Sequence, residues 1–330
     1  MAKTVNTAFE QFNKEYVSLD PERVDVAKRS RDWLLNQLIA LPEKISDFPR
    51  LFNDMHVHHG SFSRKTKIRP LDDIDLFLTF TGDGTTYDTL ILGEKYTLRV
   101  PQGTTSFLRN FCNEDMTLNS KMLINKIISS LDKIEQYKTA EKHRNGEAAT
   151  LQLSSYEWNF DIVPAFYTDT GHYIIPDGQG SWKATDPRID HKRVEQVSAI
   201  HGDKARRLVR KVKYWNRRAM IKTIPSYLLE NLVLNYASSQ TSLSDYIDIN
   251  LVNFWNYLIT AIYNPVPDPK GFQGDLNTLE YEDKVKISDK ARDSVNKGQE
   301  AIYFETKESD HSKAINKWRE IFGDNFPKYE

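Results

Sequence analysis

The stretch GSFSRKTKIRPLDDIDLFLTF, residues 60–80, decides the fold. It opens with a Gly-Ser pair, passes through a basic segment, and ends in an apolar run that contains Asp73 and Asp75. Because side chains alternate along a strand, the two aspartates share one face. The opposite face, which we expect to point into the core, consists of Ile74, Leu76 and Leu78. A strand that runs through the interior therefore carries two carboxylates on its other side.

The acidic face has two interpretations. Carboxylates two positions apart repel each other, and a divalent cation with oxygen ligands, most often Mg²⁺, relieves that repulsion. The alternative is a solvated face without function, since an acid-x-acid pattern is common in a chain with 46 acidic residues. By the same alternation, the side chain of Asp72 is expected to point with Ile74, away from a metal site, and to be dispensable for chemistry.

The surrounding residues favour the metal interpretation. Gly60 and Ser61 can offer backbone N–H groups and a hydroxyl to a phosphate. Asp161 interrupts the apolar strand EWNFDIVPAF, where an acid is uncommon without a reason. The inward positions of that strand are Trp158, Phe160 and Ile162. Metal ions beside a phosphate site are the arrangement used for phosphoryl or nucleotidyl transfer.

Length and composition limit the class of protein. The 330 residues suffice for two lobes, and the net charge of -1 argues against a general nucleic-acid coating protein. The one cysteine, Cys112, allows no intrachain disulfide, which fits a reducing compartment. The sequence shows neither a signal peptide nor an apolar run long enough for a bilayer, so we expect a cytoplasmic protein without a membrane anchor.

Hydrophobic patterning divides the chain into two parts. The first is predicted to be mixed α/β, with a helix at 20–41, strands at 54–59 and 73–80, a hairpin within 81–106, a helix at 119–134 and two strands within 151–167. The second is predicted to be helical, with helices at 204–220, 226–237, 251–263, 285–306 and 313–322. The change of pattern at 195–205 predicts two domains, residues 1–200 and residues 201–330.

A basic segment follows this boundary. Residues 204–222 carry many Lys and Arg side chains and no acid, a strong local asymmetry in a chain of net charge -1. Leu208, Val212 and Trp215 are spaced to bury one side of a helix, so the cations must line the others. The segment is either a solvated basic face or a clamp for a polyphosphate placed opposite the carboxylates.

Taken in order, these segments resemble a known family. Gly60–Ser61, Asp73-Ile74-Asp75 and Asp161 resemble the nucleotidyltransferase signature of the DNA polymerase β superfamily. The longer run GSFSRKTKIRPLDDIDLFL is similar to that of bacterial cGAS/DncV-like nucleotidyltransferases, also called CD-NTases. Other matching segments are WNFDIVPAF, IIPDGQGSWKATDP, LVRKVKYWN and IPSYLLE. The resemblance covers nearly the whole chain. It implies an α+β fold, a polymerase-β-like nucleotidyltransferase lobe with a mixed sheet plus an oligoadenylate-synthase-like helical lobe.

The resemblance also implies site residues. The catalytic carboxylates, which would bind two Mg²⁺ ions (Mn²⁺ could substitute), are Asp73, Asp75 and Asp161. The β- and γ-phosphates would be gripped by Gly60 and Ser61. Further nucleotide contacts would come from Lys213, Ser226 and Tyr227.

Each of these further contacts has an alternative. Lys211 and Arg210 compete with Lys213 for the triphosphate. Ser226 could cap a helix, and Tyr227 could simply pack at a helix start.

CD-NTases join nucleoside triphosphates into cyclic di- or trinucleotides that act as second messengers in anti-phage defence (CBASS). The resemblance implies the same Mg²⁺-dependent reaction here, with ATP and/or GTP as substrates and a purine-containing cyclic dinucleotide favoured over a trinucleotide. The product would act on a cyclic-nucleotide-sensing effector. We expect a monomer without stable DNA or RNA binding. The alternatives are a polymerase-β-like enzyme that modifies RNA, protein or a small molecule, and a catalytically inactive nucleotide-binding scaffold.

The run MHVHH invites a metal interpretation of its own, because His56 and His58 share a strand face. The sequence offers neither a partnering cysteine nor a clear further ligand, which argues against zinc. We expect these histidines to pack beside the active site, and Trp182 in GQGSW to be structural.

Overall fold

The acidic strand lies inside a nine-stranded mixed sheet. The computed structural model describes residues 2–91 and 95–330. Strand β2 (Asp73–Phe80) pairs with β1 antiparallel and with β7 parallel, and the main path of the sheet runs β1-β2-β7-β8-β9-β4-β3. The hairpin β5–β6 joins the sheet through β6 and β7. The other strands are β1 (Val57–His59), β3 (Thr86–Ile91), β4 (Lys95–Arg99), β5 (Glu141–Asn145), β6 (Ala148–Gln152), β7 (Asn159–Tyr167), β8 (Tyr173–Pro176) and β9 (Trp182–Thr185).

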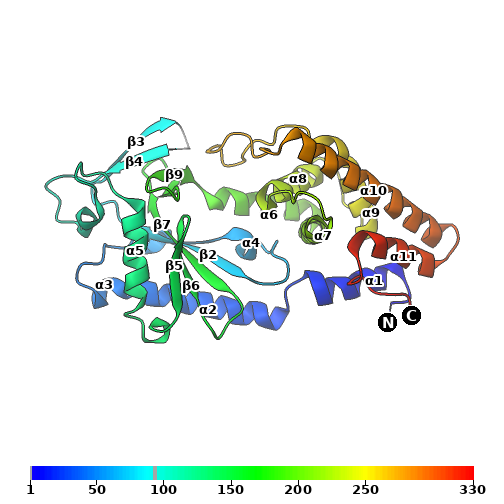
Figure 1. Ribbon diagram of the computed structural model, residues 1–330, viewed down its shortest axis with the longest axis horizontal. Helices are drawn as coiled ribbons and strands as arrows, with labels where there is room; N and C mark the ends of the chain where they lie inside the picture. Colours follow the sequence, from blue (N-terminus) through cyan, green and yellow to red (C-terminus); the bar gives the residue numbers. More distant parts are fainter. Residues whose placement is uncertain (1, 92–94) are drawn as a thin grey trace.

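Two helices cover one face of this sheet (Figure 1). Helix α2 (Pro21–Ile39) begins where the Asp20 carboxylate accepts hydrogen bonds from two backbone N–H groups, as predicted for its cap, and helix α5 (Ser120–Leu131) is capped by Asn119. The apolar face of β2 packs into the core that they share with the sheet. The short helices of this half are α3 (Leu41–Lys44) and α4 (Gly60–Ser63).

The other face of the sheet is more polar at one end. Phe77 and Val163 lie there in a small apolar cluster with residues of β6 and β8. Asp73, Asp75 and Asp161 occupy the same face, because they alternate with the core residues on β2 and β7. The predicted alternation of both strands is therefore confirmed.

The second half is helical, as predicted. Its helices are α6 (Pro187–His201), α7 (Lys204–Arg218), α8 (Ser226–Ser238), α9 (Ile247–Ala261), α10 (Tyr281–Thr306) and α11 (His311–Phe322). Three fully buried tryptophans, Trp215, Trp255 and Trp318, lie in its core. Helix α10 approaches α9 so closely that a Cβ on Gly298 would lie 2.5 Å from a methyl of Val252.

The start of the chain packs with this helical half. Helix α1 (Val5–Phe12) contributes Phe9 and Phe12 to the core that also contains Trp318, and Ala2 forms an isolated bridge with Tyr329 (Figure 1). In the core, residues 2–17 therefore belong with α6–α11. The α+β class is confirmed, and the division into residues 1–200 and 201–330 stays a prediction.

Some elements differ from the sequence expectation. The strand expected at 54–59 begins only at Val57, and the hairpin expected within 81–106 is β3–β4, whose connection at 92–94 lies outside the described residues. Strands β5, β8 and β9 and helices α1 and α6 were not predicted. Among the described residues, no helix is both long and apolar enough to cross a bilayer.

Candidate active site

The sheet register brings two of the predicted carboxylates side by side. In the parallel pairing of β2 with β7, Asp75 lies opposite Asp161, and Asp73 lies opposite Asn159. On the other side of β7, Thr150 donates its hydroxyl to Oδ1 of Asp161 at 2.5 Å. Aspartates that are far apart in the sequence thus meet on one face of two neighbouring strands.

The backbone of Gly60 approaches this group at close range. A Cβ on Gly60 would lie 1.7 Å from Oδ2 of Asp75, and Gly60 has φ +76°, a conformation that other residues rarely adopt. Asp75 faces His59 across the β1–β2 pairing, one residue before the Gly-Ser pair. Only glycine fits here, so the predicted phosphate-binding turn and the acidic strand form one site.

Burial and mutual repulsion shift the titration of these carboxylates. Burial, with the charges of Asp73 and Asp161, raises the pKa of Asp75 from 3.8 to about 7. Burial also raises the pKa of Asp161, although the hydrogen bond from Thr150 opposes the shift. A cation beside Asp75 would offset the cost of its ionisation.

The donor set suits Mg²⁺, although the three carboxylates do not converge on a single point. They supply the hard oxygen ligands that Mg²⁺ prefers, and the raised pKa of Asp75 records the electrostatic demand for a cation. In the described part of the chain, no three His, Cys, Asp or Glu side chains are already arranged to hold a metal ion. Asp73 is engaged elsewhere, because its carboxylate contacts the ammonium of Lys67.

Asp72 does not lie as predicted. Its carboxylate contacts the same Lys67 ammonium as Asp73 does, rather than pointing away with Ile74. The alternation rule fails here because β2 begins only at Asp73, which leaves Asp72 in the preceding loop. That Asp72 is dispensable for chemistry stays a prediction.

A cavity of about 200 Å³ lies in the cleft between the two halves. From the sheet half it is lined by Gly60, Arg64 and Lys183, and from the helical half by Asp190, Tyr227 and Lys270, among others. Tyr227 donates its hydroxyl to Asp190 at 2.6 Å, and Nζ of Lys270 lies 4.5 Å from the centre of its ring. One face of the Tyr227 ring, which is expected to contact the nucleotide, is thus covered by an ammonium.

The predicted Ser226 lies next to this cavity. It is the exposed first residue of α8, and Pro225 occupies the cap position without a side-chain hydrogen bond. The alternative interpretation of Ser226 as a helix cap is therefore not what the structure shows. Ser61 is half-buried, and its carbonyl accepts N–H groups of Thr66 and Lys67 at 2.9 and 3.1 Å. Among the described residues its hydroxyl forms no hydrogen bond with the chain.

Lys213 is placed beneath the cleft rather than in it. Its side chain is only 7% exposed, and its ammonium donates to Glu230 at 2.7 Å. Glu230 also accepts from Arg64 at 2.7 Å and from Thr66 at 2.8 Å. Burial alone would raise the pKa of Glu230, but Lys213 and Arg64 lower it to about 2. The structure thus shows Lys213 within a buried ion cluster. Its triphosphate role stays a prediction.

The basic segment holds a loop of the chain itself. One face of α7 donates to four backbone carbonyls between the Gly-Ser turn and β2, a set of contacts that we call the α7 ladder. The pairs are Arg206 with the carbonyl of Arg64 (3.3 Å), Arg210 with Lys65 (2.8 Å), Lys213 with Thr66 (3.2 Å) and Arg217 with Arg69 (2.9 Å). These cations therefore contact the chain rather than forming a solvated face, and the polyphosphate clamp stays a prediction.

Lys211, considered as a competitor of Lys213, is also buried. It donates to Asn13 at 2.8 Å, and burial lowers its pKa to about 7. Arg210, the other competitor, belongs to the α7 ladder. Both competitors therefore contact the chain, and Arg210 also lines a cavity of about 410 Å³ beside Lys65 and Lys67.

The metal interpretation concerned His56, which precedes β1, and His58, which lies within it. No third ligand joins them within residues 2–91 and 95–330, and the nearest acid, Asp32, lies 3.6 Å from Nε2 of His58. Burial lowers the pKa of both His56 and His58 to about 4. They are neutral packing groups beside the site. Trp182 is buried and donates to the carbonyl of Leu118, which confirms its structural role.

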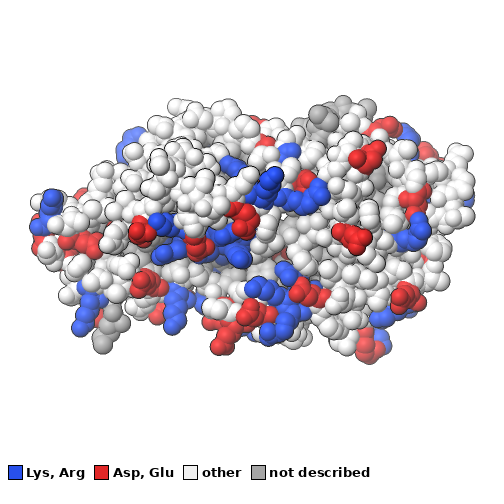
Figure 2. Space-filling model, turned by 180° about the vertical axis from the view of Figure 1, so that it is seen from behind, with Lys and Arg blue, Asp and Glu red and all other residues white. Residues whose placement is uncertain are grey.

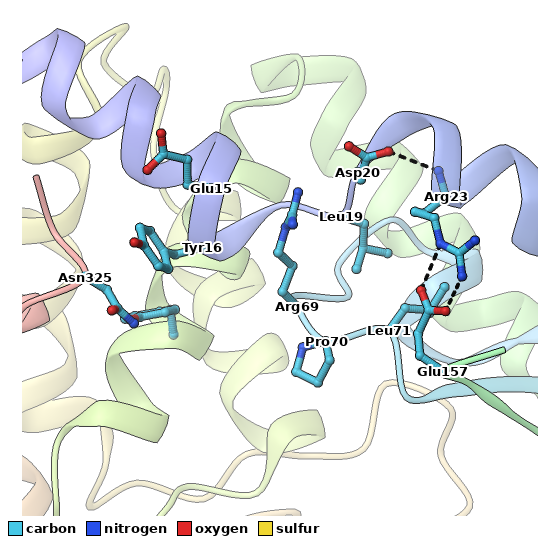
Figure 3. Close-up of a pocket in the computed structure, with 11 residues that line it drawn as sticks. Glu15, Tyr16, Leu19, Asp20, Arg23, Arg69, Pro70, Leu71, Glu157 and Asn325 are labelled. Atoms are coloured by element: carbon cyan, nitrogen blue, oxygen red, sulfur yellow. Dashed lines mark hydrogen bonds and ion pairs between the residues drawn. The ribbon is translucent and has the colours of Figure 1, made fainter. Parts of the chain in front are cut away.

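A larger cavity, of about 480 Å³, lies at another junction of the two halves (Figure 3). Tyr16, Arg69 and Asn325 line it, and the ion pair of Arg23 with Glu157 closes one side. It contains none of the predicted site residues, so volume alone does not identify the active site. On the face shown in Figure 2, Lys and Arg lie interspersed with Asp and Glu, in keeping with the net charge of -1.

Individual known proteins are similar to this chain in sequence and in fold. No protein-family model matches it. A probable cyclic nucleotide synthase of Bacillus cereus (strain VD146) is 47% identical to it over 336 aligned residues, which cover 100% of both chains. The chain belongs to the CD-NTase family. It is accordingly an enzyme of the nucleotidyltransferase class.

More distant CD-NTases share the fold. A cyclic AMP-AMP-AMP synthase of Acinetobacter sp. (strain ATCC 27244 / 9458) is 23% identical over 200 residues, 56% of this chain and 54% of that protein. E. coli MS115-1 CdnC, solved in a complex with HORMA-deltaN, matches at TM-score 0.72 and 16% identity over 97% of this chain and 98% of its own. Apo DncV of Vibrio cholerae matches at 0.68 and 13%, over 99% and 97%. The predicted two-lobe fold is confirmed.

Sequence reasoning missed several residues of the CD-NTase cleft. Lys270 comes from the proline-rich loop after α9, where nothing in the sequence signals a site. Asp190 is one of two acids in a polar helix, where an acid is common. Glu230 was within reach, because an acid inside the apolar run SYLLENLVL is as unusual as Asp161 in its strand.

Proposed function

We propose that the protein condenses ATP and/or GTP into a cyclic oligonucleotide in a Mg²⁺-dependent reaction. The observation that carries the proposal is the packing of Gly60 against the Asp75 carboxylate, with Asp161 alongside on β7. This places a backbone that can approach a phosphate next to the carboxylates that would hold the metal. The relatives named above as cyclic nucleotide synthases support a cyclic product.

The chain's own groups have distinct tasks in this reaction. Asp73, Asp75 and Asp161 would hold two Mg²⁺ ions, which when bound supply charge neutralisation at the triphosphate and lower the pKa of the attacking hydroxyl. The hydroxyl of Thr150 fixes Asp161. Gly60 and Ser61 bind the phosphates at the turn that begins α4. Arg64, on the cavity wall, adds a positive charge at the same end.

The helical half would bind the nucleoside. Tyr227, oriented by its hydrogen bonds to Asp190 and Asp268, presents a ring for base stacking once Lys270 moves from its face. Ser226 is exposed at the start of α8 for a phosphate contact. The protein that provides these groups is, in this proposal, cytoplasmic and monomeric, and its product signals to an effector in anti-phage defence.

The products of the relatives, rather than the geometry of this cleft, bear on the ring size of the product. Structures of DncV contain GTP and a linear intermediate, 5′ pppA(3′,5′)pG, which supports ATP and GTP as substrates. We keep the cyclic dinucleotide as the favoured product, with the trinucleotide of the Acinetobacter relative as the other ring size.

The test is direct synthesis. The protein is incubated with each labelled nucleoside triphosphate alone and in pairs, with Mg²⁺, and the phosphatase-resistant product is weighed and digested with linkage-specific nucleases. We expect a resistant cyclic product from wild type and none from Asp75→Asn. Label that appears only on an added RNA, protein or small-molecule acceptor would identify the other nucleotidyltransferase reaction, and binding without pyrophosphate release would identify an inactive scaffold.

A further inference from the structure

Lys67 places a fixed positive charge at the edge of the carboxylate site. Its side chain is only 9% exposed, and its ammonium contacts Asp72 and Asp73, whose side chains are 53% and 44% exposed. Each of the two carboxylates that it contacts offers its ammonium an ion pair. It is therefore a built-in cation for an acidic strand that would otherwise carry unbalanced charge.

The backbone that carries Lys67 is held on both sides. Its own N–H donates to the carbonyl of Ser61 at 3.1 Å, and the neighbouring Thr66 is fixed by Glu230 and Lys213. Two residues on, the carbonyl of Arg69 accepts from Arg217. With this backbone tied to α7 and α8, the position of Lys67 is set, and its side chain has two carboxylates within reach.

We propose that Lys67 competes with the metal ion for Asp73, and that Asp72 retains the Lys67 ammonium when the metal binds. The inference rests on the proposed metal site. A divalent ion at Asp73 would repel the nearby ammonium, and Asp72 offers that ammonium a second carboxylate partner. Lys67 and Asp72 are thus positioning residues, which set the affinity for the metal without binding it.

This arrangement predicts opposite effects for its two members. In Lys67→Gln the carboxylate of Asp73 has lost its competing cation, so metal binding tightens by about tenfold. In Asp72→Asn the ammonium depends on Asp73 alone, so metal binding weakens by about tenfold. In the double variant Asp72→Asn has no further effect, because no ammonium is left to retain.

The experiment is Mn²⁺ binding to the full-length, nucleotide-free protein at low ionic strength, by electron paramagnetic resonance and calorimetry, with the Mn²⁺-induced shift in unfolding midpoint as a second readout. Lys142→Gln is the matched control, because Lys142 is also 9% exposed and pairs with a half-exposed acid, Asp132, which is not one of the predicted site residues. It should bind Mn²⁺ as wild type does.

The outcomes separate this inference from the proposed function. Opposite shifts that merge in the double variant support it. Equal affinity for Mn²⁺ in Lys67→Gln and wild type overturns the inference. Weakening by Asp72→Asn that persists in the double variant also overturns it, because Asp72 would then act as a simple negative charge. Both results leave the metal site intact. Absence of Mn²⁺ binding to wild type, or binding unaffected by Asp73→Asn, overturns the inference and the metal assignment together.

Discussion

At the scale of the residue, Gly60 decides whether the site can form. The side chain of any other residue would enter the space of the Asp75 carboxylate, and the positive φ adds backbone strain. In Gly60→Ala we expect Asp75 to be displaced and the synthesis rate to fall by about a hundredfold or more, since a shift of about one ångström can have that effect.

Gly103→Ala is the control for this substitution, because a Cβ there meets nothing within 4 Å. Product formation and the unfolding midpoint are measured for both variants. Full activity in a folded Gly60→Ala protein would show that the close approach to Asp75 has no part in catalysis.

Asp75 should also control how the metal-free protein responds to pH. Its pKa of about 7 lies above its ordinary 3.8, so the folded state binds this proton more tightly than the unfolded state does. This proton contributes at most about 4 kcal/mol to the free energy of unfolding. The contribution is complete below about pH 4 and is lost as the pH rises toward 7. Asp75→Asn should be flatter over this range and more stable than wild type at pH 7.

Denaturant unfolding in EDTA between about pH 4.5 and 8 measures this difference. Asp289→Asn, a 66%-exposed acid on α10, serves as the control and should follow the wild-type curve. Parallel curves for wild type and Asp75→Asn would mean that Asp75 is not the group that titrates. Added Mg²⁺ should reduce the loss in wild type, since the ion takes the place of the proton.

At the scale of the element, α8 is joined to the Gly-Ser turn through Glu230. The buried carboxylate accepts from Arg64, Thr66 and Lys213, so removing its charge leaves two cations without their partner. We expect Glu230→Gln to lower the free energy of unfolding by about 3 kcal/mol or more. Glu135→Gln breaks an ion pair with Lys138 whose acid is 76% exposed, and should change it by less than about 1 kcal/mol. Equal, small effects in the two variants would show that the buried cluster is not needed for stability.

At this scale the sequence predicts the features that depend on the local order of polar and apolar residues. The two faces of β2, the Asp20 cap of α2 and the helices of the second half follow from side-chain alternation and capping chemistry. The pairing of Asp75 with Asp161 was expected only because both interrupt apolar strands. Local periodicity contains no information on which strands become neighbours. Strands β8 and β9 went unpredicted because four residues each are too few to show a clear alternation.

The basic segment shows why partners are harder to predict than elements. Its spacing indicated which face of α7 is apolar, but a cation can be satisfied equally by a phosphate, by water or by a backbone carbonyl. The structure shows carbonyls of residues 64–69 as the partners of the α7 ladder. For Lys213, the decisive fact is the buried Glu230, which lies on another helix and is adjacent only after folding.

At the scale of the whole molecule, the cavity in the cleft is smaller than a site for a nucleoside triphosphate has to be. Its cavity of about 200 Å³ lies below the roughly 300–1,000 Å³ usual for small-molecule sites, so the halves or the loop between them must yield to admit a nucleoside triphosphate. The segment after α9 is placed to do so. Lys270 and Gln273 line the cavity, and Asp268 organises the turn by accepting N–H groups of Lys270 and Phe272.

Phe272 fastens this segment to the sheet half. Its ring lies 5.1 Å from that of His172 and packs against the sheet core. We expect Phe272→Ala to release the segment, so that nucleotide associates several-fold faster and dissociates faster still, because base and triphosphate are less enclosed. Hydrogen exchange at residues 264–275 should rise in the same variant while the core of β2 stays protected. Tyr303→Ala, which removes a 55%-exposed ring near the end of α10, should change neither rate. Unchanged association in Phe272→Ala would place the opening in a movement of the two halves instead, with Glu230 and the α7 ladder as the contacts that such a movement has to preserve.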